Sequence, residues 1–175
     1  MRTLVLGGIR SGKSGWAETA IAAAAGSDPV RYLATGAQPD QDAEWARRVA
    51  AHRRRRPPHW TTEETTDVAG RLRADRTATL VDDIGGWLTA EMDHRGAWTG
   101  APMSPATDDL VGAVLGFPAP LALVSPEVGL TVVPATAAGR RFADELGLLN
   151  QRLAACCDRV VLVVAGQPLT VKEPG

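Results

Sequence analysis

The sequence predicts an α/β protein with a mainly parallel central sheet flanked by helices. Three observations lead to this fold class. Short apolar runs alternate with helical patterns along the chain. Several runs are continuously apolar, which is typical of strands covered on both faces of a sheet. A glycine-rich turn separates the first run from the first helical pattern. A chain of 175 residues that is 45% apolar suits one domain spanning residues 1–175.

Seven segments have the composition of strands, with apolar or β-branched residues between turn-forming residues. Residues 159–165, RVVLVVA, are the clearest case because the whole run is apolar after its first residue. Residues 167–172 follow after one glycine and are expected to return as an antiparallel edge strand. In chain order, the predicted strands are residues 2–6, 30–35, 60–63, 77–81, 121–125, 159–165 and 167–172.

Six segments are expected to be helices from their periodicity or their helix-forming composition. The Ala-rich segment 14–25 ends at Gly26, a common helix stop. Residues 42–54 form a strong helical pattern that two consecutive prolines close. The Gly- and Pro-rich stretch 96–105 is predicted to be a mobile loop. In chain order, the predicted helices are residues 14–25, 42–54, 68–74, 84–93, 108–115 and 137–157.

The glycine-rich turn is a P-loop, since residues 7–14, GGIRSGKS, match G-x-x-x-x-G-K-S/T between a strand and a helix. Triphosphate oxygens need backbone N–H groups around them, and a helix that starts at the loop points its first amides at the phosphates. Lys13 then reaches the β- and γ-phosphates, and the Ser14 hydroxyl binds Mg²⁺. The predicted nucleotide-binding residues of the loop are Gly7, Gly8, Ile9, Arg10, Ser11, Gly12, Lys13 and Ser14.

Composition and strand position add two further hypotheses about this site. The chain has 17 arginines and only two lysines, Lys13 and Lys172, so a lysine in the motif indicates a need for a compact ammonium. A P-loop enzyme usually has a second Mg²⁺ ligand at the end of an apolar strand of the same sheet. Asp82 has this position, although an aspartate before a helix can also be an N-cap. We expect Ser14 and Asp82 to hold the metal.

Four consecutive arginines follow His52 at the end of the predicted helix 42–54. Three roles suit such a run: an RNA-binding patch, a solvated helix end, or a clamp on nucleotide phosphates. The net charge of -1 argues against nucleic acid as a partner. A single histidine on a helix is usually a surface side chain, so His52 acquires a functional role only from the pattern around it.

The chain resembles, nearly end to end, the bifunctional adenosylcobinamide kinase/adenosylcobinamide-phosphate guanylyltransferase family of cobalamin biosynthesis. Besides the P-loop, the segments that carry the resemblance are YLATG at 32–36, LVDDIGGWL at 80–88, EVG at 127–129, RRFADELGLLNQRLA at 140–154 and VVLVVAGQPLTVK at 160–172. The specific pattern is R-V/I-x-x-H-x-x-x-R-x-x-x-W-x-T-x-E, which is formed here by Arg48, Val49, His52, Arg56, Trp60, Thr62 and Glu64.

The resemblance implies two reactions at one nucleotide site. ATP or GTP first gives its γ-phosphate to the hydroxyl on the aminopropanol arm of adenosylcobinamide. His52 then attacks the α-phosphorus of GTP, and the bound GMP passes to the phosphorylated corrinoid to give adenosyl-GDP-cobinamide. A neutral imidazole suits this step because it is a good nucleophile near pH 7. Mg²⁺ is the implied cofactor, and adenosylcobinamide and its phosphate are the implied corrinoid substrates.

The resemblance also assigns residues. His52 and Lys13 are the implied catalytic residues, and Glu64 is expected to contact the guanine or the ribose. Beyond the P-loop, the implied nucleotide-binding residues are Thr35, Gly36, Ala37, Arg53, Arg54, Arg55, Arg56, Glu64 and Asp82, while Ser14 and Asp82 are the implied metal ligands.

The chain departs from the usual family pattern at four positions. Pro126 stands where Asn is usual and Thr131 where Gly is usual, while Asp83 and Gly85 replace what are commonly Cys and Thr. None of these changes removes Lys13, Ser14, His52 or Asp82. They do put in question the backbone around residues 125–131 and the corrinoid contacts there. Pro126 in addition removes one backbone N–H donor.

Two other functions stay open at this point: a relative that keeps only one of the two transfers, and a P-loop module that binds nucleotide without transferring anything. Kinase activity without a His52–GMP adduct would mark the first. The combination of a complete P-loop with His52 argues against the second, because a pure binding module needs no nucleophile. Residues 96–118 are equally open to three interpretations: a lid, an interface or a loop.

No apolar run approaches the roughly 20 residues of a membrane span, and the N-terminal run is too short for a signal peptide. We therefore expect a cytoplasmic protein without stable membrane insertion. Cys156 and Cys157 are adjacent in a helical pattern and are interpreted as small buried residues. The resemblance implies a homo-oligomer, expected to be a trimer, for which five tryptophans in a small chain give weak support.

Overall fold

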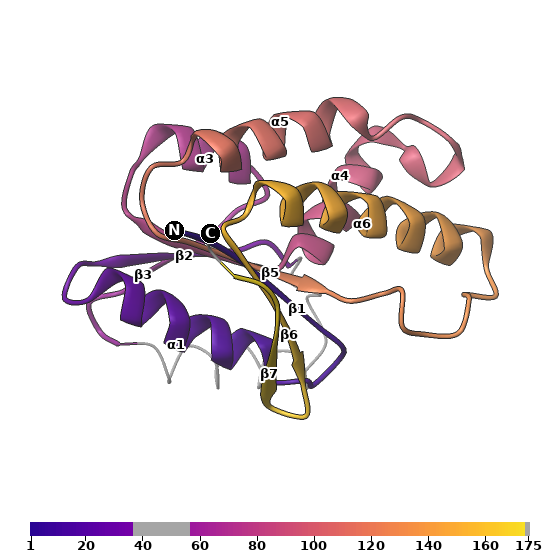
Figure 1. Cartoon of the computed structure of the whole chain (residues 1–175). Coiled ribbons are helices and arrows are strands. Elements are labelled where there is room, and N and C mark those ends of the chain that lie inside the picture. Colours follow the sequence, from indigo (N-terminus) through magenta and orange to yellow (C-terminus); the bar gives the residue numbers. More distant parts are fainter. Residues whose placement is uncertain (37–56, 174–175) are drawn as a thin grey trace.

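The computed structural model describes residues 1–36 and 57–173, and its strands form one seven-stranded sheet in the order β3-β2-β4-β5-β1-β6-β7. The described helices lie on both faces of this sheet (Figure 1). The strands are β1 (Arg2–Gly7), β2 (Val30–Ala34), β3 (Thr61–Glu64), β4 (Ala78–Asp82), β5 (Leu121–Pro126), β6 (Arg159–Val164) and β7 (Gln167–Lys172). The helices are α1 (Lys13–Ala25), α3 (Val68–Ala74), α4 (Ile84–Arg95), the short 3₁₀ helix η1 (Ala97–Thr99), α5 (Ser104–Gly116) and α6 (Ala137–Cys156).

The sheet is parallel from β3 to β6, and β7 runs antiparallel to β6 at the edge. The predicted fold class and its antiparallel C-terminal edge strand are confirmed. The central strands read as continuous apolar runs because helices cover both of their faces. In β5, for example, every residue before Pro126 is buried.

Two apolar cores lie on the two faces of the sheet. On one face, α1 packs through Ala17 and Ile21 against side chains such as Val5 and Leu80. On the other face, α3, α4, α5 and α6 bury a larger cluster that includes Leu4 (Figure 1). Neighbouring residues such as Leu4 and Val5 serve opposite cores because successive side chains in a strand point to opposite faces.

Most predicted element ends agree with the structure to within two residues, but the segment 96–105 differs. It contains η1, and α5 begins at Ser104 rather than at residue 108. The loop prediction for its last residues was therefore wrong. The reason is that Pro105 fits the first turn of a helix, where its missing N–H has no intrahelical acceptor, and Ala106 is buried.

The predictions for the helix 42–54 and for the two cysteines compare differently with the structure. The predicted helix 42–54 lies outside the described residues. Cys157 is buried as expected, whereas Cys156 is only partly buried, so the interpretation of both as buried residues was half wrong. In the two described stretches, no helix has the length and apolarity needed to cross a membrane.

The parallel arrangement brings the carboxyl ends of six strands to one edge of the sheet. Gly7, Glu64, Asp82 and Pro126 are the last residues of β1, β3, β4 and β5. In open α/β sheets, ligands bind in the crevice outside this edge. The fold therefore collects the described candidate residues, which are far apart in sequence, along one side of the molecule.

Candidate functional site: a P-loop opposite an acidic strand end

The P-loop leaves β1 at Gly7 and enters α1 at Lys13. Two of its residues have left-handed backbone angles, Arg10 with φ of 57° and Gly12 with φ of 93°. At Gly12, a side chain would also meet the β6–β7 turn, because a Cβ would lie 3.2 Å from the Cα of Gly166. The tight turn of the chain at the start of α1 thus requires glycine at position 12 for two physical reasons.

Hydrogen bonds from two neighbouring strand ends hold the P-loop in shape. The amide of Glu127, just after β5, donates to the carbonyl of Gly7 at 3.1 Å. The amide of Gly166, in the β6–β7 turn, donates to the carbonyl of Ser11 at 2.8 Å. With both carbonyls paired to neighbouring segments, the loop backbone is fixed from both sides by the protein's own contacts.

Lys13 folds back over the loop that it closes. Its ammonium donates to the carbonyl of Gly8 at 3.2 Å, and its own amide donates to the Ser11 hydroxyl at 3.4 Å. The ammonium of Lys13 therefore lies over the loop, where the motif predicts that it meets a bound phosphate.

Ser14 and Asp82, the two residues predicted to hold a metal, lie within hydrogen-bond distance of each other. The Ser14 hydroxyl donates to one carboxylate oxygen of Asp82 at 3.4 Å. The Tyr32 hydroxyl donates to the other oxygen at 2.5 Å. The carboxylate is therefore oriented from two sides, with one oxygen toward the P-loop.

Tyr32 was missed in the sequence. It is the only tyrosine in the chain and it lies in a buried strand, but the strand pattern gives no indication of which acid its hydroxyl meets.

The Ser14–Asp82 pair fits Mg²⁺ by its chemistry. Hydroxyl and carboxylate oxygens are the donors that Mg²⁺ accepts, and this ion normally keeps several ligands from water and nucleotide phosphates. Within residues 1–36 and 57–173, no three His, Cys, Asp or Glu side chains gather into a metal centre. A Mg²⁺ ion at this pair would complete its coordination with water and nucleotide phosphate oxygens.

Asp82 was a candidate either for the metal or for the N-cap of the following helix. In the structure, the N-cap of α4 is Asp83. The Asp83 carboxylate accepts the amide of Gly86 at 2.6 Å and so caps α4. Burial raises the pKa of Asp83, and the neighbouring charge of Asp82 raises it further. The Thr35 hydroxyl donates to the Asp83 carbonyl at 2.5 Å, which fixes the end of β2 next to the start of α4. Asp82 is thus left to face Ser14.

The structure collects part of the predicted nucleotide set. Gly36 and Thr35 lie against the first turn of α4, because a Cβ on Gly86 would be 3.2 Å from Thr35 Oγ1 and 3.3 Å from Gly36 Cα. Glu64 ends β3 on the same edge, but β2 separates β3 from β4, so Glu64 and Asp82 are roughly 10 Å apart. The predicted residues that lie outside the described part are Ala37, His52, Arg53, Arg54, Arg55 and Arg56.

Two of the unusual positions turn out to touch each other. A Cβ on Gly85 would lie 2.8 Å from Cγ of Pro126, so the proline fits because position 85 has no side chain. The amide that contacts the P-loop comes from Glu127, so the donor lost at Pro126 is not part of that contact. The Pro126 carbonyl accepts a hydrogen bond from Nδ2 of Asn150 at 3.1 Å. The backbone at the end of β5 is therefore held in place despite the proline.

Comparisons with known proteins match this chain over nearly its whole length. A family model described as cobinamide kinase / cobinamide phosphate guanyltransferase matches residues 3–171. The bifunctional adenosylcobalamin biosynthesis protein CobP of Pseudomonas aeruginosa is 42% identical over 183 residues, which cover 99% of each chain. Two bifunctional adenosylcobalamin biosynthesis proteins CobU, from Salmonella typhimurium and Escherichia coli, are 38% and 35% identical, each over 98% of this chain and 100% of the relative.

Proposed function

Since the chain belongs to the cobinamide kinase / cobinamide phosphate guanyltransferase family, we propose that it catalyses both transfers in cobalamin biosynthesis. The first phosphorylates the aminopropanol hydroxyl of adenosylcobinamide with ATP or GTP. The second adds GMP from GTP to that phosphate and gives adenosyl-GDP-cobinamide. The observation that supports the proposal most directly is the P-loop, whose Ser14 faces Asp82 at 3.4 Å.

In the kinase reaction, the P-loop amides and Lys13 bind the triphosphate and balance its negative charge. The substrate hydroxyl forms a new bond to the γ-phosphorus, the bond to the β-phosphate oxygen breaks, and the hydroxyl proton is released. Mg²⁺ bound at Ser14 and Asp82 would neutralise charge on the β- and γ-phosphate oxygens. Tyr32 acts as a positioning residue, because its hydroxyl bond keeps the Asp82 carboxylate turned toward Ser14.

In the guanylyl transfer, His52 attacks the α-phosphorus of GTP, a nitrogen–phosphorus bond forms, and pyrophosphate leaves. A phosphate oxygen of the corrinoid then takes the GMP and releases His52. The arginines 53–56 would bind phosphate oxygens, for which guanidinium forks are well suited. Glu64, at the edge of the sheet beyond Asp82, would bind the guanine or the ribose. These roles rest on the family pattern, because His52 and the arginines lie outside the described residues.

The first test is the intact mass of purified protein incubated with GTP and Mg²⁺ and no corrinoid. We expect the mass to increase by one GMP and the adduct to be labile in acid, as a histidine phosphoramidate is. His52→Ala should give no adduct. The chain has three histidines, so His59→Ala and His94→Ala are matched controls that should keep the adduct.

The other possible results of this mass measurement would each change the proposed function. An adduct that persists in His52→Ala would assign the nucleophile to another residue. A wild-type protein that binds GTP but forms no adduct would exclude the bifunctional enzyme and leave a kinase or a nucleotide-binding module, which phosphorylation of adenosylcobinamide would separate. The homo-oligomer, a trimer by family resemblance, is tested by light scattering of the same preparation.

A further inference from the structure

The loop between β5 and α6, whose first residue Glu127 is hydrogen-bonded to Gly7 of the P-loop, exposes large apolar side chains. Leu130, Val132 and Val133 are 76%, 91% and 73% exposed. Ile9, in the P-loop itself, is 91% exposed. Single exposed apolar residues are common, but several together at the border of a site indicate a surface that a ligand or partner covers.

Hydrogen bonds define the conformation of this loop at both of its ends. At its start, the Glu127 carboxylate accepts the amide of Gly129 at 2.6 Å. At its end, the Arg140 guanidinium donates to the carbonyls of Pro134 and Ala135 at 3.0 and 2.8 Å. The three apolar side chains are therefore exposed on a loop whose two ends are fixed by hydrogen bonds.

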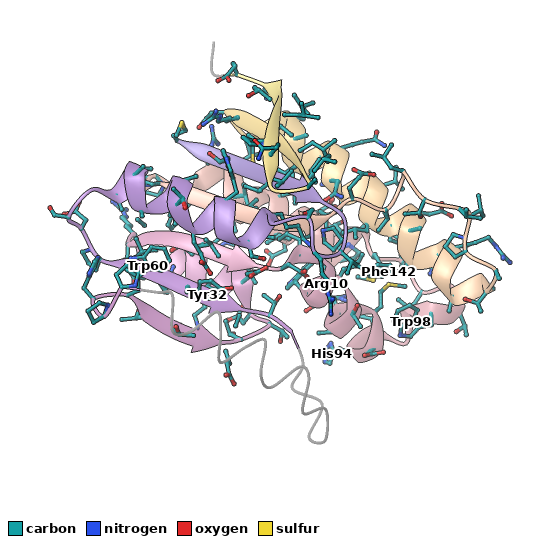
Figure 2. All side chains as sticks on the ribbon, turned by 90° about the horizontal axis from the view of Figure 1, so that it is seen from below. Arg10, Tyr32, Trp60, His94, Trp98 and Phe142 are labelled. Atoms are coloured by element: carbon teal, nitrogen blue, oxygen red, sulfur yellow. The ribbon has the colours of Figure 1, made fainter. Side chains whose placement is uncertain are left out.

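The start of α6, which the loop enters, is also held firmly. Phe142 stacks on Trp98 with ring centroids 6.5 Å apart, and Arg141 donates to the carbonyl of Ala101 at 2.7 Å. Figure 2 shows Trp98 and Phe142 on the same side of the molecule as Arg10 of the P-loop. Figure 1 shows the chain after β5 running out beyond the sheet before it returns into α6.

The position of the loop matches the side from which an acceptor substrate must approach. This step rests on the proposed function: the acceptor hydroxyl has to reach the γ-phosphate bound at Lys13 and Ser14. Glu127 is hydrogen-bonded to Gly7, and three residues of chain span at most about 10 Å, so Leu130 is close enough to border the P-loop. On the opposite flank of the site, the strand ends carry the charged side chains of Asp82 and Glu64.

We propose that Leu130, Val132 and Val133 form the surface on which the corrin ring of the acceptor rests while its aminopropanol arm reaches into the P-loop. A corrin is a large, methyl-bearing ring whose faces and rim are largely apolar, whereas a nucleotide would place its charged phosphates on the loop amides. The apolar loop therefore contributes to binding of the corrinoid and leaves nucleotide binding unaffected.

The test compares Val132→Asp with Val171→Asp. Val171 is 64% exposed and lies on the edge strand β7, so the control makes the same substitution at another exposed position, away from this loop. For Val132→Asp we expect the KM for adenosylcobinamide to rise by about tenfold or more, as loss of one buried valine contact predicts. The KM for GTP and the GMP adduct should stay unchanged. Val132→Ser should shift the corrinoid KM in the same direction by less, and Val171→Asp should match the wild type.

Direct binding keeps this proposal separate from the proposed function. Equilibrium dialysis of adenosylcobinamide against protein loaded with Mg²⁺ and GDP reads binding from the visible absorption of the corrinoid. If Val132→Asp binds the corrinoid more weakly than the wild type and Val171→Asp does not, the proposed corrin-binding surface is supported. This holds even if the wild type transfers no phosphate, because a lack of transfer would contradict only the proposed function. Equal corrinoid affinity in wild type and Val132→Asp would overturn the surface. A change of oligomeric mass in Val132→Asp would overturn it as well, by assigning the loop to contacts between subunits.

Discussion

Replacing Gly7 by alanine tests whether the first glycine of the P-loop is required by the protein's own packing. A Cβ at this position would overlap the Ser11 hydroxyl and lie 2.8 Å from the carbonyl oxygen of Val163. The Ser11 side chain can rotate away, but it then loses the hydrogen bond from the Lys13 amide. The Val163 carbonyl belongs to β6, which pairs with β1 at this residue, so the clash can be relieved only by moving backbone.

The expected magnitude follows from this geometry. Forcing one extra methyl group into a packed site costs about 1–3 kcal/mol. Gly8→Ala is the matched control, because a Cβ at position 8 meets no atom within 4 Å and its φ lies outside the left-handed region. We expect Gly8→Ala to change the free energy of unfolding by no more than about 0.5 kcal/mol.

The assay is urea unfolding of the wild type and both variants, together with GTP binding. Gly7→Ala should also bind GTP more weakly, since the backbone that moves carries the loop amides. If Gly7→Ala is as stable as Gly8→Ala, the packing argument for the first glycine is refuted. A loss of GTP binding without a loss of stability would show that the position matters for the ligand alone.

Two further substitutions test contacts found away from the P-loop. Gly85→Thr should lower the free energy of unfolding by about 1–3 kcal/mol through its clash with Pro126, and by clearly less when combined with Pro126→Asn; additive effects in this double-mutant cycle would contradict the contact. Hydrogen bonds from the side chain and the amide of Arg2 lower the pKa of the Asp158 carboxyl. Its contribution to stability is therefore present above the ordinary aspartate pKa and is lost as the pH falls through the lowered value. Asp158→Asn should cost up to about 1 kcal/mol near pH 7, because the Arg2–Asp158 pair is partly exposed. The substitution should also make the free energy of unfolding depend less on pH below about pH 4. Denaturant unfolding from pH 7 to pH 3 measures this, and an equal pH dependence in wild type and Asp158→Asn would contradict the prediction.

The sequence was sufficient for the features that depend on local pattern. The parallel sheet follows from its buried apolar runs, and the P-loop from its spacing and its place between a strand and a helix. The metal role of Asp82, which was inferred from its position at the end of an apolar strand, stays a prediction, and the structure places its carboxylate within hydrogen-bond distance of Ser14. The edge strand β7 was predicted because one glycine separates it from a buried strand, which leaves room only for a tight return.

Contacts made between distant segments were beyond sequence reasoning. The period of a strand assigns Tyr32 to a face but gives no partner, so its bond to Asp82 was missed. The Gly166 amide that holds Ser11 comes from a turn more than 150 residues further along the chain, and a backbone donor leaves no trace in side-chain composition. The clash that links Gly85 to Pro126 depends on how α4 packs beside β5. In each case the partner is selected by the order of strands in the sheet, which tertiary packing decides.

The place of β1 in that order has a consequence for how the enzyme folds during its synthesis. β1 leaves the ribosome before the other described strands, yet both of its neighbours, β5 and β6, lie far downstream in the sequence. Both of its buried faces and its backbone hydrogen bonds must therefore wait until those strands have been made, and such non-local pairing is intrinsically slow. The phosphate-binding loop, which needs Glu127 and Gly166 to hold it, becomes complete only after residue 166 has been made. A nascent chain stalled before β6 would carry the full nucleotide motif without the shaped loop, and nucleotide could stabilise only the finished fold.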